Sequence, residues 1–231
     1  MATLYIVATP IGNLQDITLR ALEVLKSVDA IFCEDTRVTA KLLAHFDITK
    51  PLHAYHQHSD ERVVAQAAAM LTEGKALALV SDAGTPGIND PGGRLVQQVL
   101  ALMPDVRIVP IPGANAAVVA LSASGFPADR YQYWGFVPHK KGRQTFFADL
   151  AHTEDTVVFY ESKHRILKTM QQIQEALEKG ETPQRPLLVA RELTKKFETL
   201  YRGTAAHIAS QLTGDNGLGE FVVVIGPKGW K

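Results

Sequence analysis

Short, continuous runs of apolar residues recur along the first half of the chain. They have the length of strands, and their lack of polar alternation is typical of strands buried on both faces of a parallel sheet. Segments with helical spacing of apolar residues lie between them, so consecutive strands are expected to run parallel as βαβ units. The expected strands are residues 3–8, 30–33, 52–55, 76–80 and 106–109.

The helical segments of this half carry signals for where they begin and end. Asp16 is expected to cap the first helix, which continues through Leu25. Ser59 is expected to cap the third helix, and Gly74 to end it. The second and fourth helices are expected over residues 39–46 and 94–102.

The second half of the chain begins near residues 111–113 and predicts a different sheet. Its two clearest helices are expected over residues 114–124 and 163–177. A short helix separates the strands expected at 198–202 and 220–225, which permits these two strands to pair antiparallel, so the sheet is expected to be mixed. The other expected strands are residues 131–136, 157–160 and 187–190.

The chain is therefore expected to be an α/β protein of two domains. Its N-terminal domain, residues 1–111, contains the parallel sheet, and its C-terminal domain, residues 112–231, contains the mixed sheet. In open α/β sheets, ligands bind outside the carboxyl ends of the strands. Three loops rich in glycine and proline leave such strand ends, at residues 9–13, 81–92 and 112–115.

The loop over residues 81–92 is the most informative of the three. Its three glycines let a ligand approach the backbone, its two prolines fix its shape, and Asp82 and Asp90 can accept hydrogen bonds from a ligand. The alternative is a plain surface connection in which Asp90 caps the helix that starts near Pro91. The nucleotide-binding motifs G-x-G-x-x-G and G-x-x-x-x-G-K-[ST] are both absent from the sequence, which disfavours NAD and ATP as ligands.

Composition limits the classes of partner and the compartment. Lysine plus arginine and aspartate plus glutamate both number 24, so the formal net charge is zero and any RNA binding must use local basic patches. The single cysteine, Cys33, excludes an internal disulfide and favours a reducing compartment. Because no signal peptide and no run of about 18 apolar residues is present, we expect a cytoplasmic protein without a membrane span.

Three groups of basic side chains lie in the second half. Each group alone is typical of a solvated surface, whereas the three together could form a patch that follows RNA phosphates. The groups are His139, Lys140, Lys141 and Arg143, then Lys163, His164 and Arg165, and finally Arg191, Lys195 and Lys196.

Titratable side chains follow two of the expected strands. The tetrapeptide Glu-Asp-Thr-Arg at residues 34–37 stands at a strand end, where Arg37 could clamp a phosphate. The alternative is that Asp35 or Thr36 caps the next helix while Arg37 is solvated. Glu161 ends another buried strand and is a further candidate for a functional role.

His53, His56 and His58 form a cluster of histidines. His56 and His58 would share one face if this segment were a strand. A zinc site needs three or four converging ligands, and Cys33 is distant in the sequence, so contact with RNA or a plain surface is favoured and no metal is expected.

Taken in order, these segments resemble the tetrapyrrole (corrin/porphyrin) methylase superfamily. Within it they look like the branch that methylates the ribose 2′-hydroxyl of a cytidine in small-subunit (16S) ribosomal RNA. The resemblance spans nearly the whole chain. Its most specific motifs are TPIGNLQDIT at 9–18, SDAGTPGINDPG at 81–92 and YESKHR at 160–165, with EDTR at 34–37, PGANAA at 112–117 and ARELTK at 190–195 beside them.

The resemblance implies a homodimer of two-domain chains that binds S-adenosyl-L-methionine in the cleft between the domains and methylates RNA of the small ribosomal subunit. It implies cofactor contacts at matching positions, although Thr85 stands where the superfamily commonly has aspartate, and Asn115-Ala116 where it has Ser-Ser. The implied contacts are Pro10, Ile11, Gly84, Thr85, Ile88, Asn115, Ala116, Tyr160 and Glu220.

A general base for the 2′-hydroxyl and the RNA contacts are expected among charged side chains at strand ends. Four carboxylates remain alternatives for the base: Glu34, Asp35, Asp82 and Glu161. Arg37, His56, Arg165 and Lys195 are expected to face RNA. Two other functions remain open, namely a tetrapyrrole C-methyltransferase of the same fold and a non-catalytic module that binds a nucleotide or RNA.

Overall fold

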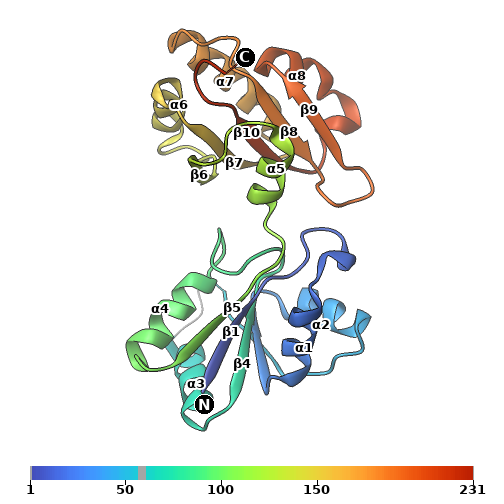
Figure 1. Cartoon of the computed structure of the whole chain (residues 1–231), viewed down its shortest axis with the longest axis vertical. Helices are drawn as coiled ribbons and strands as arrows, with labels where there is room; N and C mark the ends of the chain where they lie inside the picture. Colours follow the sequence, from blue (N-terminus) through green and yellow to red (C-terminus); the bar gives the residue numbers. More distant parts are fainter. Residues whose placement is uncertain (1, 57–60, 231) are drawn as a thin grey trace. The chain divides into compact units, whose positions relative to one another are not determined.

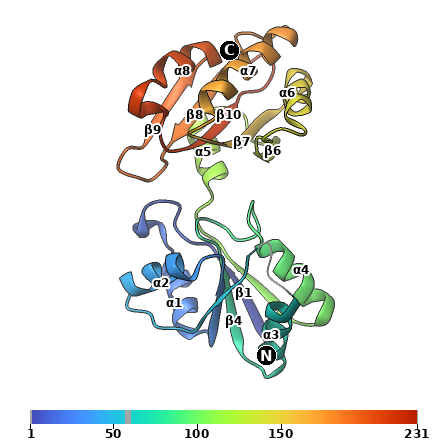
Figure 2. The same cartoon turned by 180° about the vertical axis from the view of Figure 1, so that it is seen from behind.

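The computed structural model describes residues 2–56 and 61–230, and its contacts divide the chain into two compact units. Unit 1 comprises Met1–Asn115 and unit 2 comprises Ala116–Lys231, so the division lies a few residues after the end of the expected N-terminal domain. Each unit contains one five-stranded sheet with helices on both faces (Figures 1 and 2). The helix cap expected at Ser59 lies outside the described residues.

Unit 1 is built on a parallel sheet with the strand order β3-β2-β4-β1-β5. The five expected strands and their parallel pairing are confirmed. Because β1 is flanked by β4 and β5, the loops that leave the carboxyl ends of these three strands start side by side. The strands are β1 (Thr3–Val7), β2 (Ala30–Cys33), β3 (Leu52–Ala54), β4 (Ala76–Val80) and β5 (Arg107–Ile111).

Two pairs of helices cover opposite faces of this sheet (Figure 1). They are α1 (Leu19–Ser27) and α2 (Thr36–His45) on one face, and α3 (Glu61–Thr72) and α4 (Gly92–Leu102) on the other. The chain leaves β1 toward α1 on one face and leaves β4 toward α4 on the opposite face. The neighbouring carboxyl ends of β1 and β4 therefore form the topological switch point, where open sheets bind ligands.

Two helix starts in unit 1 differ from the expectation. A short 3-10 turn, η1 (Leu14–Asp16), precedes α1, and the hydroxyl of Thr18 accepts a hydrogen bond from a first-turn amide at 3.0 Å. The expectation that Asp16 caps this helix is wrong because Thr18 is the extended residue directly before the first turn. The second helix begins earlier than expected because Asp35 caps it, accepting from the amide of Arg37 at 2.8 Å.

Unit 2 contains the expected mixed sheet, in the order β6-β7-β10-β8-β9. Only β6 and β7 are parallel neighbours, and the other neighbours are antiparallel. The antiparallel pairing that the sequence permits between the strand near 198–202 and the last strand does not form, because β9 forms a hairpin with β8 and lies at the sheet edge. The strands are β6 (Tyr131–Phe136), β7 (Thr156–Ser162), β8 (Leu187–Arg191), β9 (Thr199–Gly203) and β10 (Glu220–Ile225).

The helices of unit 2 are unevenly divided between the two faces of its sheet. One face carries three helices and the larger core, and α5 lies on the other face (Figures 1 and 2). They are α5 (Ala116–Ser124), α6 (Arg143–His152), α7 (Ile166–Lys179) and α8 (Ala205–Gln211). Helix α6 was not predicted from the sequence, although Phe146, Phe147 and Leu150 are buried at helical spacing and could have indicated it.

Candidate functional site

The three glycine- and proline-bearing loops of unit 1 meet at the carboxyl ends of β4, β1 and β5. The amide of Thr9 donates to the carbonyl of Gly84 at 2.9 Å, and the amide of Gly84 donates back to the carbonyl of Thr9 at 3.1 Å. The hydroxyl of Thr85 donates to the carbonyl of Ala114 at 3.0 Å, which adds the third loop. The three loops therefore form one connected backbone surface at the switch point.

This close approach of backbones depends on glycine at two positions. Gly84 has a φ of +86°, and a Cβ added there would lie 3.3 Å from Cγ2 of Ile11. A Cβ added at Gly113 would lie 2.7 Å from Cβ of Ala8. Side chains at these two positions would push the loops apart, so the contact between the loops requires glycine here.

Asp90 shapes the longest of the three loops. Its carboxylate accepts hydrogen bonds from the amide of Gly87 at 2.8 and 2.9 Å and from the amide of Gly92 at 2.7 Å. Asp90 thus fixes the loop against the first residue of α4, although the N-cap of this helix is Pro91 and not Asp90, the residue that the alternative interpretation expected. The side chain of Ile88 is exposed on the same loop. Asp82 is therefore the carboxylate of this loop that remains a candidate for chemistry.

Glu34 and Asp82 stand at the carboxyl ends of the neighbouring strands β2 and β4. The carboxylate of Asp82 accepts from the amide of Asp35 at 3.0 Å, which joins the two strand ends. Burial raises the pKa of Glu34, and the carboxylates of Asp82, Asp90 and Asp35 raise it further. Burial is also the main cause that raises the pKa of Asp82. The pKa values of both carboxyl groups are thus shifted toward neutral pH, as is common for groups that transfer protons.

Asp35 and Arg37 form an ion pair at the surface. The guanidinium of Arg37 donates to the carboxylate of Asp35 at 2.6 Å through Nη2 and at 3.0 Å through Nε. This side-chain bond, together with amides of α2, lowers the pKa of Asp35 to about 2, which makes Asp35 a weak base. The side chain of Arg37 is 86% exposed, so an anion in solution can reach it.

Tyr160 packs at the end of β7 within unit 2. Its hydroxyl accepts from the amide of Ala117 at 3.2 Å, and its ring lies edge-on to Phe136 and to a second tyrosine. Burial raises the pKa of Tyr160. Tyr160 therefore holds the first turn of α5 against the sheet. Of the other two expected cofactor residues here, Ala116 begins α5, and Asn115 is the last residue of unit 1.

Glu161 is a fully buried carboxylate that binds two arginines. Nη2 of Arg165 lies 2.7 Å from one of its oxygens, and Nη1 of Arg143 lies 3.6 Å from the other. The hydroxyl of Thr169 donates to Glu161 at 2.7 Å. Both guanidiniums also donate to backbone carbonyls of the connection between β6 and α6. Glu161 is therefore a buried anchor for that connection, and most of the guanidinium of Arg165 is engaged in the same network.

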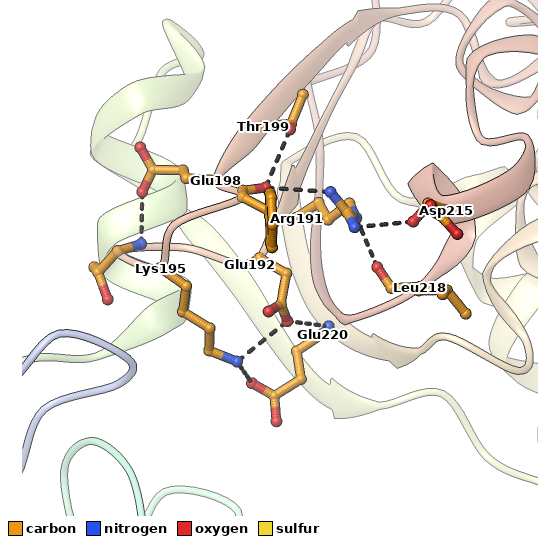
Figure 3. Close-up of polar contacts among 10 residues, drawn as sticks. Arg191, Glu192, Lys195, Glu198, Thr199, Asp215, Leu218 and Glu220 are labelled. Carbon is orange, nitrogen blue, oxygen red and sulfur yellow. Dashed lines mark hydrogen bonds and ion pairs between the residues drawn. The ribbon is translucent and has the colours of Figure 1, made fainter.

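Lys195 and Glu220 contact each other in unit 2. The ammonium of Lys195 donates to Glu192 at 3.1 Å and to Glu220 at 2.6 Å (Figure 3). Burial alone would lower the pKa of Lys195, but the two carboxylates outweigh this effect and raise it. Lys195 is thus a link between the β8–β9 connection and the start of β10, whereas Lys196, the next residue, is exposed.

The histidine cluster is only partly within the described residues. His53 stacks on Phe32 with ring centroids 5.0 Å apart, His56 is exposed, and His58 lies outside the described ranges. Across residues 2–56 and 61–230, no group of three or more His, Cys, Asp or Glu side chains could hold a metal ion. In the same part of the chain, no helix has the length and apolar character needed to cross a membrane.

Gly113→Ala is expected to test whether the loops must approach so closely. The added carbon would lie 2.7 Å from Cβ of Ala8, so we expect a loss of about 1–3 kcal/mol in the free energy of unfolding, measured by urea denaturation. Gly93→Ala is the matched control, because its new Cβ would meet no atom closer than 3.7 Å and lies within α4. Equal losses in the two variants would contradict the close approach.

The fold and the site of unit 1 define a class of protein. A doubly wound parallel sheet, with hydrogen-bonded loops and two carboxyl groups of raised pKa at its switch point, is typical of α/β enzymes that bind a small ligand there. Residues 3–209 match the tetrapyrrole (corrin/porphyrin) methylase family. The chain therefore belongs to this family.

Known relatives are similar to the chain over nearly its full length. "Ribosomal RNA small subunit methyltransferase I" of Halalkalibacterium halodurans is 46% identical over 233 residues, which cover 99% of this chain and 77% of that protein. The protein of the same name from Escherichia coli O157:H7 is 46% identical over 225 residues, covering 96% of this chain and 77% of the relative.

Solved structures share the fold at lower identity. A cobalt precorrin-4 methyltransferase of cobalamin biosynthesis has a TM-score of 0.69 at 20% identity, covering 97% of this chain and 95% of that one. The uroporphyrin-III C-methyltransferase of Thermus thermophilus, solved with S-adenosylhomocysteine, has a TM-score of 0.64 at 16% identity, covering 97% of each chain. The expected two-domain α/β fold of the methylase superfamily is confirmed.

Proposed function

We propose that this protein transfers the methyl group of S-adenosylmethionine to the ribose 2′-hydroxyl of a cytidine in small-subunit (16S) ribosomal RNA. The observation that carries the proposal is 46% identity, over 96–99% of this chain, to relatives named small-subunit ribosomal RNA methyltransferases. Three solved tetrapyrrole methyltransferases of the same fold are 16–21% identical to this chain. This level of similarity supports the fold alone.

The residues of unit 1 fit S-adenosylmethionine as cofactor. Its sulfonium and ammonium charges and its ribose hydroxyls are complementary to the carboxyl group of Asp82, and its adenine suits the exposed apolar surface of Ile88. When bound, it supplies an electrophilic methyl group. The proposal assigns cofactor contacts to Pro10, Ile11, Gly84, Thr85, Ile88, Asn115, Ala116, Tyr160 and Glu220.

Glu34 is proposed to be the general base. Among the four candidates, Asp35 has a lowered pKa and Glu161 is fully buried between two arginines. One oxygen of Asp82 binds the amide of Asp35, so its carboxylate also shapes the loop. Glu34 would accept the proton of the 2′-hydroxyl, while the loops of unit 1 align the reactants. Alignment can supply up to roughly 7–11 kcal/mol in ideal cases.

A labelling experiment tests the proposed function directly. The protein is incubated with S-adenosylmethionine tritiated in its methyl group, in one reaction with small ribosomal subunits from a strain that lacks the protein and in another with a uroporphyrinogen substrate. Label is expected in a single ribose of the ribosomal RNA. Label in the tetrapyrrole alone would replace the proposal by the C-methyltransferase alternative, and calorimetry without any binding of S-adenosylmethionine would favour the non-catalytic module.

The acid limb of the pH–rate profile is expected to report Glu34. Because burial and then Asp82 raise its pKa, kcat/KM for methyl transfer should fall as pH drops through this raised value. Asp82→Asn removes one negative charge and keeps an oxygen that can accept from the amide of Asp35. The pKa of Glu34 then falls, and the acid limb should move to lower pH. An acid limb at the same pH in the variant would contradict this assignment.

The remaining assignments concern assembly, compartment and RNA contacts. We propose that the protein is a homodimer and that it acts in the cytoplasm. Sedimentation of the purified protein tests the first assignment, and cell fractionation tests the second.

The proposed RNA contacts remain Arg37, His56, Arg165 and Lys195. Arg37 has the strongest support because its side chain is 86% exposed. Arg37, Arg165 and Lys195 would each have to share their charge with the carboxylates that they bind.

A further inference from the structure

The loop that joins β8 and β9, residues 192–198, is held in place by a buried arginine. Arg191 is 8% exposed, and its guanidinium donates to the carbonyls of Leu218 at 2.6 Å, Asp215 at 2.9 Å and Phe197 at 3.2 Å (Figure 3). One carbonyl belongs to the hairpin loop, and the other two belong to the segment before β10. A planar guanidinium that binds both segments fixes their positions relative to each other.

Two residues of this loop have a backbone conformation that is unusual for their type. Glu192 has a φ of +51° and Thr194 a φ of +66°. Local hydrogen bonds compensate the strain: the carboxylate of Glu192 accepts from the amide of Glu220 at 2.8 Å, and that of Glu198 accepts from the amide of Thr194 at 2.6 Å. Backbone strain that several side chains maintain is characteristic of functional segments.

The outer side of this fixed loop presents an aromatic ring and a cation together. Phe197 is 63% exposed, and the ammonium of Lys196 lies 5.5 Å from the centre of its ring. Aromatic rings bind unstacked bases of single-stranded RNA by stacking, and nearby lysines neutralise the flanking phosphates. Because the backbone of the loop is already ordered, little conformational freedom is lost when these side chains bind a ligand.

We propose that Phe197 stacks on an unpaired base of the ribosomal RNA substrate and that Lys196 contacts a neighbouring phosphate. This inference rests on the proposed function, and it adds Phe197 and a phosphate contact of Lys196 to Lys195, the RNA contact already proposed in this loop. Lys195 binds two carboxylates and thereby also holds the loop, and its exposed neighbours add further contacts to the RNA. Because Lys196 is an exposed cation, polyanionic RNA suits this site better than a second copy of this neutral chain.

Three variants of the full chain test the site. Unmethylated small-subunit ribosomal RNA with a fluorescein end label is the probe, and its affinity is measured by anisotropy over a range of salt concentrations. Phe197→Leu keeps an apolar side chain but cannot stack, so binding should weaken about 5- to 150-fold. Phe197→Tyr should bind nearly as wild type. Lys196→Gln should reduce the slope of log affinity against log salt by about 0.7.

Two controls separate the possible failures. Leu167→Ala removes an exposed apolar side chain on α7 and should bind RNA as wild type. Sedimentation of each variant shows whether its assembly has changed. Unchanged RNA affinity in Phe197→Leu, or a loss that occurs only together with a loss of assembly, would overturn the RNA-contact site. If wild type itself failed to methylate or bind the RNA, the proposed function would fail, and the site with it.

Discussion

Glu34→Gln is expected to slow methyl transfer to the RNA by about 10²–10⁴-fold, which is the contribution typical of a general base. Glutamine has nearly the shape of glutamate but cannot accept the proton of the 2′-hydroxyl. The raised pKa of Glu34 makes it a stronger base than an ordinary carboxylate, so its removal should affect the chemical step more than binding. Single-turnover rates with saturating RNA and S-adenosylmethionine measure this step.

The matched control for this experiment is Glu23→Gln. Glu23 is exposed on α1 in the same unit, so its neutralisation changes the net charge equally without touching the strand ends. Calorimetry should show that both variants still bind S-adenosylmethionine. If Glu34→Gln reacted as fast as Glu23→Gln, transfer would not depend on this carboxylate, and alignment alone would account for the rate.

The parallel sheet of unit 1 could be predicted because its signals are local. Each strand is a short apolar run, and the loops after β1, β4 and β5 contain glycine and proline in the sequence itself. That the loops meet also follows from the rule that parallel strands end at one edge. The contacts that join them, such as the Thr9–Gly84 bridge and the bond from Thr85 to Ala114, pair residues distant in the sequence and needed the structure.

The roles of the charged residues were harder to predict because they depend on distant partners. In the tetrapeptide at 34–37, the sequence alone could not separate Asp35, which caps α2 and binds Arg37, from Glu34, whose neighbours are Asp82 and Asp90. The basic groups of unit 2 illustrate the same difficulty. Arg143 is buried in α6 and binds Glu161, so it differs in kind from the exposed lysines just before it.

Glu161→Ala is expected to lower the free energy of unfolding of unit 2 by about 3–5 kcal/mol, because it leaves two largely buried guanidiniums without their carboxylate. The hydroxyl of Thr169 would lose its acceptor as well. Urea unfolding followed by tryptophan fluorescence measures this unit specifically, since both tryptophans, Trp134 and Trp230, belong to it.

A second variant, in which both arginines are replaced together with Glu161, decides the role of Glu161. Its free energy of unfolding is compared with that of Glu161→Ala. Arg143→Met and Arg165→Met, combined with Glu161→Leu, replace the buried carboxylate and both guanidiniums by apolar side chains, and such replacements are often neutral or stabilising. The triple variant should therefore be more stable than Glu161→Ala. The control is Glu175→Ala, which changes an exposed residue of α7 and should stay within about 0.5 kcal/mol of the stability of wild type. A triple variant no more stable than Glu161→Ala would mean that the arginines stabilise unit 2 through the backbone carbonyls between β6 and α6, independently of the carboxylate.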